Sequence, residues 1–98
     1  MAIKSFKDKI SEDICHGLRS KQTAKRIPFE LHPKVMIKLA RIAAATSLND
    51  LSELRGNRLE ILKGNRLGQY SIRINDQYRI CFRWYDNDAF DIEITDYH

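Results

Sequence analysis

Residues that bind anions and residues that move protons occupy two short stretches of this chain. The first is the glycine-bounded sequence KGNRLG, which carries Lys63 and Arg66. The second is the tripeptide Asp96-Tyr97-His98, in which a phenol and an imidazole can both transfer protons. Together these residue types suit chemistry on an anionic substrate, provided that the fold brings the two stretches side by side.

Two alternating segments between these stretches predict a strand pair. Apolar residues recur at every second position, in the order Tyr70, Ile72, Ile74, Tyr78, Ile80, Phe82 and Trp84. This period of two is typical of strands that are buried on one face only. A two-residue turn would mix the faces, so we expect a three-residue loop, 75–77, that keeps the apolar positions opposite one another. Arg73 then stands directly opposite Arg79 on the polar face, and Arg83 lies further along it.

The opposed arginines have two interpretations. Like charges directly opposite each other destabilise a strand pair by some tenths of a kcal/mol. A sequence that accepts this cost either holds the pair for an anion or lets both side chains splay into water. Lys63 and Arg66 in the adjacent loop favour phosphate binding.

The last strand is expected to extend the same two faces. After a turn at 85–89, apolar Phe90, Ile92 and Ile94 alternate with Asp91, Glu93 and Thr95. Matching the apolar faces pairs Trp84 with Phe90, Phe82 with Ile92 and Ile80 with Ile94. The same parity places Tyr97 on the polar face, diagonally from Arg79. It points Asp96 away from Tyr97.

The first half of the chain predicts two helices. A short strand, IKSF at 3–6, precedes a stripe made of Phe6, Ile10, Ile14 and Leu18, which indicates an amphipathic helix that ends near Gly17. The basic stretch 19–26 is expected to be a solvated loop. Pro33 opens the longest helix, which has Val35, Leu39 and Ile42 on its buried face and Lys34, Lys38 and Arg41 on the opposite face. A short turn at 48–54 follows, before Gly56-Asn57 breaks the chain.

Length and composition limit the class of protein. The chain has 98 residues, 43% of them hydrophobic and 31% charged, which indicates a single domain, 1–98, with one modest core. It has no apolar run long enough to span a membrane and no signal peptide, so we expect a cytoplasmic protein. Cys15 and Cys81 have neither metal nor redox spacing and are expected to be free thiols. The net charge of +4 favours an acidic partner.

These elements define an α+β fold. Two helices are expected to cover one face of a small antiparallel sheet, and the other face carries the charged residues.

The motifs resemble one family across nearly the whole chain. The segment LKGNRLGQYSIRINDQYRICF, the opening IKSF and the closing DYH are similar to the HigB-like (host-inhibition-of-growth) toxins of the RelE/ParE superfamily. The resemblance implies a RelE-like fold and a bacterial type II toxin–antitoxin system. Members of this group enter the ribosomal A site and cut mRNA. A helix-turn-helix antitoxin (HigA-like) neutralises them and, together with the toxin, binds the operator DNA of their shared operon.

Internal cleavage of RNA requires a base for the 2′-hydroxyl, cations for the phosphorane and an acid for the 5′-oxygen. From this chemistry and the resemblance we expect a catalytic set of Lys63, Arg79, Asp96, Tyr97 and His98, with Glu60 as a further candidate. The register and the basic loop give an expected RNA-binding set of Arg66, Arg73 and Arg83. Lys63 and Arg79 match the family pattern best, and Asp96 either orients His98 or forms a salt bridge. No metal or other cofactor is expected. Because Arg79 is assigned to the polar face, its removal is expected to leave the fold intact.

One residue departs from the family pattern. Some members have a histidine three residues before the motif lysine, where this chain has Glu60. Glu60 either serves as the base or is a structural carboxylate that pairs with Arg58 or Arg66. Two other functions remain as alternatives: a ParE-like toxin that inhibits DNA gyrase or another target without cutting RNA, and a plain nucleic-acid-binding module. Lys63, Arg79 and Tyr97-His98 favour the ribonuclease, and the chain has no aromatic base-stacking motif typical of the last alternative.

Overall fold

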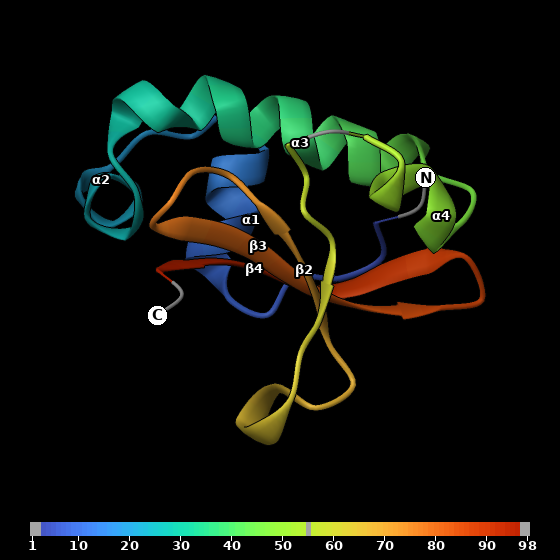
Figure 1. The fold of residues 1–98 in the computed structure, drawn as a ribbon. Coiled ribbons are helices and arrows are strands. Elements are labelled where there is room, and N and C mark those ends of the chain that lie inside the picture. Colours follow the sequence, from blue (N-terminus) through green and yellow to red (C-terminus); the bar gives the residue numbers. More distant parts are fainter. Residues whose placement is uncertain (1–2, 55, 97–98) are drawn as a thin grey trace.

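A four-stranded antiparallel sheet, in the order β1-β2-β3-β4, forms the centre of the computed structural model, which describes residues 3–54 and 56–96. Helix α3 runs along one side of the sheet and α1 lies behind it in Figure 1, with α2 and α4 near the two ends of α3. The strands are β1 (Glu60–Ile61), β2 (Tyr70–Arg73), β3 (Tyr78–Tyr85) and β4 (Asp88–Asp96). The helices are α1 (Lys9–Cys15), α2 (Lys21–Arg26), α3 (His32–Ala44) and α4 (Leu48–Ser52), and single 3-10 turns occur at Phe29–Leu31 and Gly64–Arg66. The α+β class predicted from the sequence is therefore correct.

The register of β2 and β3 is the one that the sequence predicts. Tyr70 pairs with Phe82, Ile72 with Ile80 and Arg73 with Arg79. In the loop, the side chain of Asn75 accepts hydrogen bonds from the main-chain nitrogens of Gln77 and Tyr78. The opposed arginines are thus confirmed as neighbours on the polar face.

The predicted register of β3 and β4 is correct at one end of the strand pair and wrong at the other. Ile80 pairs with Ile94 as expected, but Trp84 pairs with Ala89 and Arg83 with Phe90. The irregularity between Cys81 and Arg83 takes up an extra residue of β4, and the expected Phe82–Ile92 pair falls within it. Asp91 has a φ of 54° there, which is the left-handed conformation common in β-bulges. As a result Ala89 faces the core, whereas Phe90 shares the polar face with Arg83.

The N-terminal segment lies beside β4 rather than forming the expected full strand. Two isolated parallel bridges join Ile3 to Ala89 and Phe6 to Ile92. Helix α1 begins after Asp8, whose side chain accepts a hydrogen bond from the Ser11 nitrogen, and it ends before Gly17, which has a φ of 75°. The apolar stripe is one residue shorter than predicted, because Leu18 follows the glycine and is 53% exposed.

The expectation of a solvated loop at 19–26 is wrong, because this stretch forms α2. Ser20 and Thr23 make a reciprocal capping box that satisfies the first donors of the helix. Arg26, at the end of α2, donates to the main-chain oxygen of Ile94 at 3.1 Å and pairs with Asp8 at 3.0 Å. The basic stretch therefore attaches to α1 and β4.

Helix α3 begins as predicted, with Pro33 in its first turn, and it buries Val35, Leu39 and Ile42. Lys38 was expected on the solvent face but is only 5% exposed. Its Nζ donates to the side-chain oxygen of Asn57 at 2.7 Å. The buried face of α3 is therefore wider than its apolar stripe, because Asn57 in a distant loop accepts a hydrogen bond from the buried ammonium of Lys38. Helix α4 confirms the predicted turn after α3.

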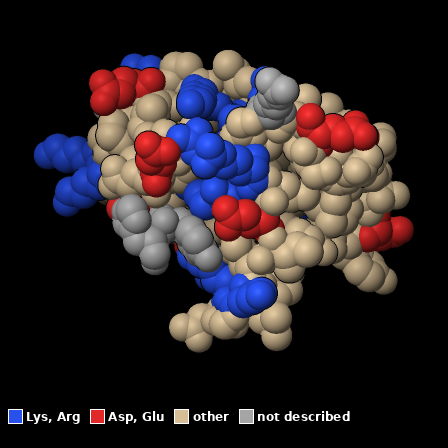
Figure 2. Space-filling model, viewed as in Figure 1, with Lys and Arg blue, Asp and Glu red and all other residues tan. Residues whose placement is uncertain are grey.

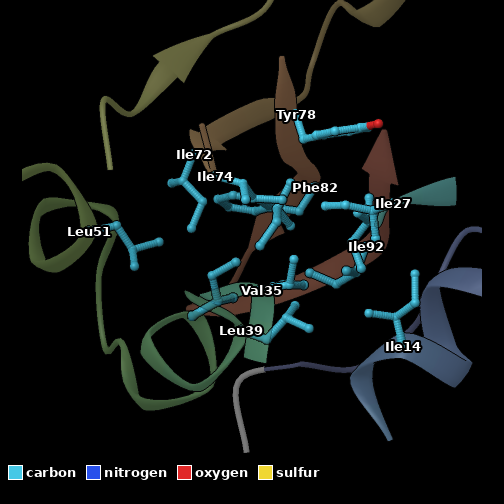
Figure 3. Packing of buried hydrophobic residues seen from close by; sticks show 14 of the residues in the cluster. Ile14, Ile27, Val35, Leu39, Leu51, Ile72, Ile74, Tyr78, Phe82 and Ile92 are labelled. Carbon is cyan, nitrogen blue, oxygen red and sulfur yellow. The ribbon is translucent and has the colours of Figure 1, made fainter. Parts of the chain in front are cut away.

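The core lies between the helices and the apolar face of β2, β3 and β4. Ile72, Ile74, Phe82 and Ile92 pack from the sheet against side chains of α1, α3 and α4 (Figure 3). The opposite face of the sheet is left to the charged residues. Among the residues that the structure describes, no helix is long and apolar enough to cross a membrane.

Candidate functional site

The polar face of the sheet and the Gly64–Arg66 turn beside it carry four arginines, and each of them has a carboxylate partner. The ion pairs are Arg66–Glu93 at 2.9 Å, Arg79–Glu60 at 3.6 Å, Arg83–Asp91 at 3.6 Å and the close pair Arg73–Asp76. The interpretation that both opposed arginines splay into water is therefore wrong, because Arg73 and Arg79 are held by carboxylate partners. The interpretation that the pair is kept for an anion stays a prediction.

Arg79 is the most constrained of the four. It is 8% exposed, its Nε donates to Ser71 Oγ at 2.7 Å, and its Nη2 donates to the main-chain oxygen of Arg58 at 2.6 Å. The carbonyl of Ser71 is a further acceptor at 3.3 Å. Arg79 thus fixes the segment that leads into β1 as well as placing a cation on this face. Its position on the polar face is confirmed, but it is buried beneath neighbouring groups.

Glu60 is in contact with Arg79. Its side chain is about half exposed and lies 3.6 Å from Arg79 Nη1, and its Cα pairs with Ser71 across β1 and β2. The structural alternative named Arg58 or Arg66 as its partner, but the ion pair is made with Arg79 instead. The carboxylate thus lies beside the guanidinium of Arg79 and neutralises part of its charge.

Lys63 differs from the arginines because it has no partner among the residues that the structure describes. It is exposed at the start of the Gly64–Arg66 turn, and its side chain makes no hydrogen bond or ion pair with any of the residues that the structure describes. The neighbouring main chain is fixed, since Leu62 is buried and its nitrogen donates to the Gln69 oxygen at 2.9 Å. Lys63 therefore presents an exposed ammonium from an anchored backbone.

Arg66 and Gly68 shape the rest of this loop. Arg66 donates to Gln69 Oε1 at 3.1 Å and to Glu93 Oε1 at 2.9 Å, so the loop is tied to β4. Gly68 has a φ of 88°, and a Cβ there would lie 2.8 Å from the side chain of Arg83. The glycine permits both the turn and the close approach of that arginine.

The end of β4 lies beside the arginine strand, as predicted. Thr95 pairs with Arg79 and Asp96 with Tyr78. Asp96 Oδ2 accepts a hydrogen bond from Gln77 Nε2 at 2.9 Å, which anchors the carboxylate to the β2–β3 loop. The predicted proton-transfer residues Tyr97 and His98 lie outside the described residues.

Two residues of this region were missed in the sequence. Ser71 could have been found, because the predicted register places it on the same face as Arg73 and diagonally from Arg79. Asn57 gives no such signal. It is fully buried, its Nδ2 donates to the Leu51 oxygen at 3.0 Å, and its own carbonyl accepts from the Arg73 nitrogen. It connects α3, α4 and β2 through contacts that are distant in sequence.

The remaining chemistry of this face is limited. Cys81 is buried opposite Ser71, and burial raises the pKa of its thiol, so it is a poor nucleophile. No group of three or more metal-ligating side chains occurs within residues 3–54 and 56–96. What this face presents in the described residues is the positive charge of its arginines and of Lys63, with the Glu60 carboxylate beside Arg79.

The fold and this basic face define a RelE-like toxin. Residues 4–98 match the family described as "RelE-like toxin of type II toxin-antitoxin system HigB", and the chain belongs to that family. It is 38% identical to Toxin HigB-1 of Vibrio cholerae serotype O1 over 86% of this chain and 85% of that protein. It is 31% identical to Endoribonuclease HigB of Proteus vulgaris over 98% of this chain and 99% of that protein.

Solved structures agree with this assignment. The YoeB–YefM complex from Staphylococcus aureus contains a chain of similar fold, with a TM-score of 0.59, 26% identity and coverage of 100% of this chain and 99% of that chain. The YoeB dimer from the same organism has the same TM-score of 0.59, with 28% identity over 100% of this chain and 97% of that chain. As a toxin of a type II system, the protein has an antitoxin as its partner.

Proposed function

We propose that this protein is an endoribonuclease that cuts mRNA on the ribosome and so stops translation and growth. Its membership of the HigB-like family and the printed name of the Proteus vulgaris relative support the activity. The antitoxin would be a helix-turn-helix (HigA-like) protein that neutralises the toxin and binds operator DNA together with it. Such an enzyme acts in the cytoplasm, where ribosomes and mRNA are found.

The observation that carries this proposal is the contrast between Lys63 and Arg79. Lys63 is exposed and makes no hydrogen bond or ion pair with the described residues, whereas Arg79 is held under the same face by Ser71 and Arg58. A fixed cation lowers the cost of bringing a phosphate to this face, and an exposed ammonium can contact the charge that develops on the phosphorane. Arg66, Arg73 and Arg83 would hold the RNA strand on either side.

The reaction needs two proton transfers. A base takes the proton of the ribose 2′-hydroxyl, the 2′-oxygen attacks phosphorus, and an acid protonates the departing 5′-oxygen. The products are a 2′,3′-cyclic phosphate and a 5′-hydroxyl. We assign the proton transfers to Tyr97 and His98, with Asp96 as an orienting carboxylate, because Glu60 is paired with Arg79.

The test compares the purified protein on programmed ribosomes and on the same mRNA without ribosomes. We expect efficient cleavage only with ribosomes, because the ribosome supplies the substrate geometry. The fragments should carry 2′,3′-cyclic phosphate and 5′-hydroxyl ends. Equal cleavage of naked RNA would contradict ribosome dependence, and inhibition of DNA supercoiling without any RNA cleavage would favour the gyrase-type alternative.

A further inference from the structure

Lys38 is a buried cation whose presence the cleavage reaction described above does not explain. Its side chain is 5% exposed, and its Nζ donates to Oδ1 of Asn57 at 2.7 Å. The acceptor is a neutral amide, which does not offset the charge, and burial lowers the pKa of Lys38. An apolar side chain in this place would avoid the cost of burying a cation. The hydrogen bond from Lys38 to Asn57 therefore points to a role beyond stability.

The side chain of Asn57 is bound from two directions. It is fully buried, with its oxygen bound to Lys38 of α3 and its Nδ2 donating to the Leu51 oxygen of α4 at 3.0 Å. The residues on either side of Asn57 adopt the left-handed conformation, with a φ of 84° at Gly56 and of 44° at Arg58. A non-glycine residue such as Arg58 keeps this conformation only where its surroundings hold it. The two hydrogen bonds of the Asn57 amide supply part of that hold.

The segment held in this way presents two successive carbonyls to the opposed arginines. The Asn57 oxygen accepts a hydrogen bond from the main-chain nitrogen of Arg73 at 2.5 Å. The Arg58 oxygen accepts one from Nη2 of Arg79 at 2.6 Å. The two arginines pair with each other across β2 and β3. A chain of contacts thus runs from the ammonium of Lys38, through Asn57 and the peptide that follows it, to both arginines.

One nitrogen of Arg79 is not used by these anchors. Nε and Nη2 donate to Ser71 and to the Arg58 carbonyl, whereas Nη1 lies 3.6 Å from the half-exposed carboxylate of Glu60. A guanidinium is planar, so fixing Nε and Nη2 also fixes the direction of Nη1. Figure 2 shows Lys and Arg atoms as a broad patch in the centre of the view, and crowded like charges repel one another. The anchor at Arg58 therefore sets the direction of Nη1 against this repulsion.

We propose that Lys38 and Asn57 are positioning residues for RNA cleavage, which hold the main chain at 57–58 so that Arg79 presents Nη1 to the phosphoryl group that is cut. The proposal rests on the proposed ribonuclease function. Neither side chain touches the RNA, because both are buried. A misplacement of about 1 Å at a reacting group can lower a rate by about a hundredfold, so a change at Lys38 can reduce cleavage while every catalytic residue is kept.

The test begins with Lys38→Met, which keeps a long buried side chain and removes the donor to Asn57. Lys38→Gln supplies an amide donor without the charge, and it therefore separates the hydrogen bond from the charge of the lysine. Lys34→Gln, one turn earlier in α3 at an exposed position, is the control for loss of a positive charge. Ile14→Val in α1 is the control for a small loss of stability in the core.

The free proteins are compared first, by hydrogen exchange of their main-chain amides. In Lys38→Met the Arg73 amide should exchange at least about tenfold faster than in wild type, because its acceptor, the Asn57 oxygen, is no longer held. The Ile94 amide, whose bond to Ser11 lies at the far edge of the sheet, should keep its wild-type rate. Lys38→Gln should exchange at both amides as wild type does. Wild-type exchange at Arg73 in Lys38→Met overturns the proposal, whether or not the protein cuts RNA.

Single-turnover cleavage on programmed ribosomes then measures the effect on catalysis. Lys38→Met should lower the maximal rate by about 10–100-fold, with little change in the protein concentration that gives half of this rate. Lys38→Gln should recover most of the loss, and Lys34→Gln and Ile14→Val should keep the wild-type maximal rate. Equal losses in Lys38→Met and Lys38→Gln would show that the charge of the lysine acts instead, and would overturn the proposal.

A double-mutant cycle with Arg79→Lys shows whether Lys38 acts through Arg79. Lysine keeps the positive charge but cannot make the forked contacts of arginine. In this background Lys38→Met should change the rate by less than about twofold, because the group that it positions is already altered. Losses that multiply independently would show a general structural effect and contradict the proposal. Absence of cleavage by the wild-type protein would refute the proposed function, whereas hydrogen exchange decides independently whether Lys38 holds this segment.

Discussion

Nη2 of Arg79 lies 2.6 Å from the main-chain oxygen of Arg58, so a sheet arginine holds the loop that leads into β1. Arg58 has a φ of 44°, a conformation that non-glycine residues seldom adopt, and its carbonyl is directed toward the guanidinium. The hydrogen bond joins two residues 21 positions apart in the chain. Arg79 is therefore structural as well as electrostatic, and its mutation has two consequences that experiments must separate.

Arg79→Ala should destabilise the protein, in contrast to the expectation from the sequence. The substitution leaves Ser71 Oγ and the Arg58 carbonyl without their donor, and each buried group that loses its partner costs about 1–3 kcal/mol. We expect the free energy of unfolding in urea to fall by about 2–4 kcal/mol, below the full sum, because the Arg58 carbonyl is only partly buried and water can replace part of its bond. Arg83→Ala is the control, because Arg83 is exposed and its ion pair is worth less than about 1 kcal/mol. Equal stability of Arg79→Ala and wild type would contradict the structural role.

Lys63→Ala should change activity without changing stability. The side chain is exposed and unpaired among the described residues, so the urea midpoint should stay at its wild-type value. The rate of ribosome-dependent cleavage should fall by about 10²–10³, as for the loss of one transition-state donor. Lys63→Arg should recover part of the rate, and Lys25→Ala in α2 should have no effect. A Lys63→Ala variant with the full rate would remove this lysine from the mechanism.

The identity of the base is decided by comparing Glu60 with the terminal pair. Glu60→Gln keeps the size of the side chain and loses one exposed ion pair, so cleavage should persist at a rate close to wild type. Tyr97→Phe and His98→Gln should each lower the single-turnover rate by about 10²–10⁴, the range for loss of a general acid or base. The reverse pattern, with Glu60→Gln inactive and the terminal variants active, would make Glu60 the base.

Asp8 should make stability depend on pH in acid. Burial raises the pKa of its carboxyl group, but the hydrogen bonds from Ser11 and Arg26 outweigh burial, and the net pKa lies below the ordinary value of 3.8. At pH values between the folded-state pKa of Asp8 and 3.8, the unfolded chain binds more protons than the folded chain. The stabilisation by Asp8 is therefore complete above this range of pH and is lost as the pH falls through it.

Asp8→Asn tests this linkage. Asparagine can still cap α1 but cannot pair with Arg26, so the variant should be less stable than wild type above the window. The difference in the free energy of unfolding should shrink as the pH is lowered through it. Arg26→Gln should give an intermediate result, because the bond from Ser11 remains. A difference that stays constant with pH would show that Asp8 has an ordinary pKa in the folded protein.

The sequence by itself determined the elements whose signals are local. The period of two in 70–84 and the three-residue loop specify the register of β2 and β3, because a slip by one residue would turn every apolar side chain to the wrong face. Pro33 specifies where α3 begins, since its fixed φ suits the first helical turn. The facing of Arg73 and Arg79 follows directly from that register, and the family follows from motifs that span nearly the whole chain.

Only the tertiary structure decided how the polar groups are matched. The bulge at Asp91 is hidden in the sequence, because Phe90, Ile92 and Ile94 keep their alternation while the extra backbone residue reverses the face of Phe90. Lys38 and Arg79 both belong to polar positions, yet both are buried, because Asn57 and the carbonyl of Arg58 accept their hydrogen bonds from a distant loop. These hydrogen-bond acceptors are far in the chain from the lysine and the arginine that they bind, so no local periodicity or propensity predicts the contacts. Whether a charged side chain can be buried depends on the presence of such an acceptor.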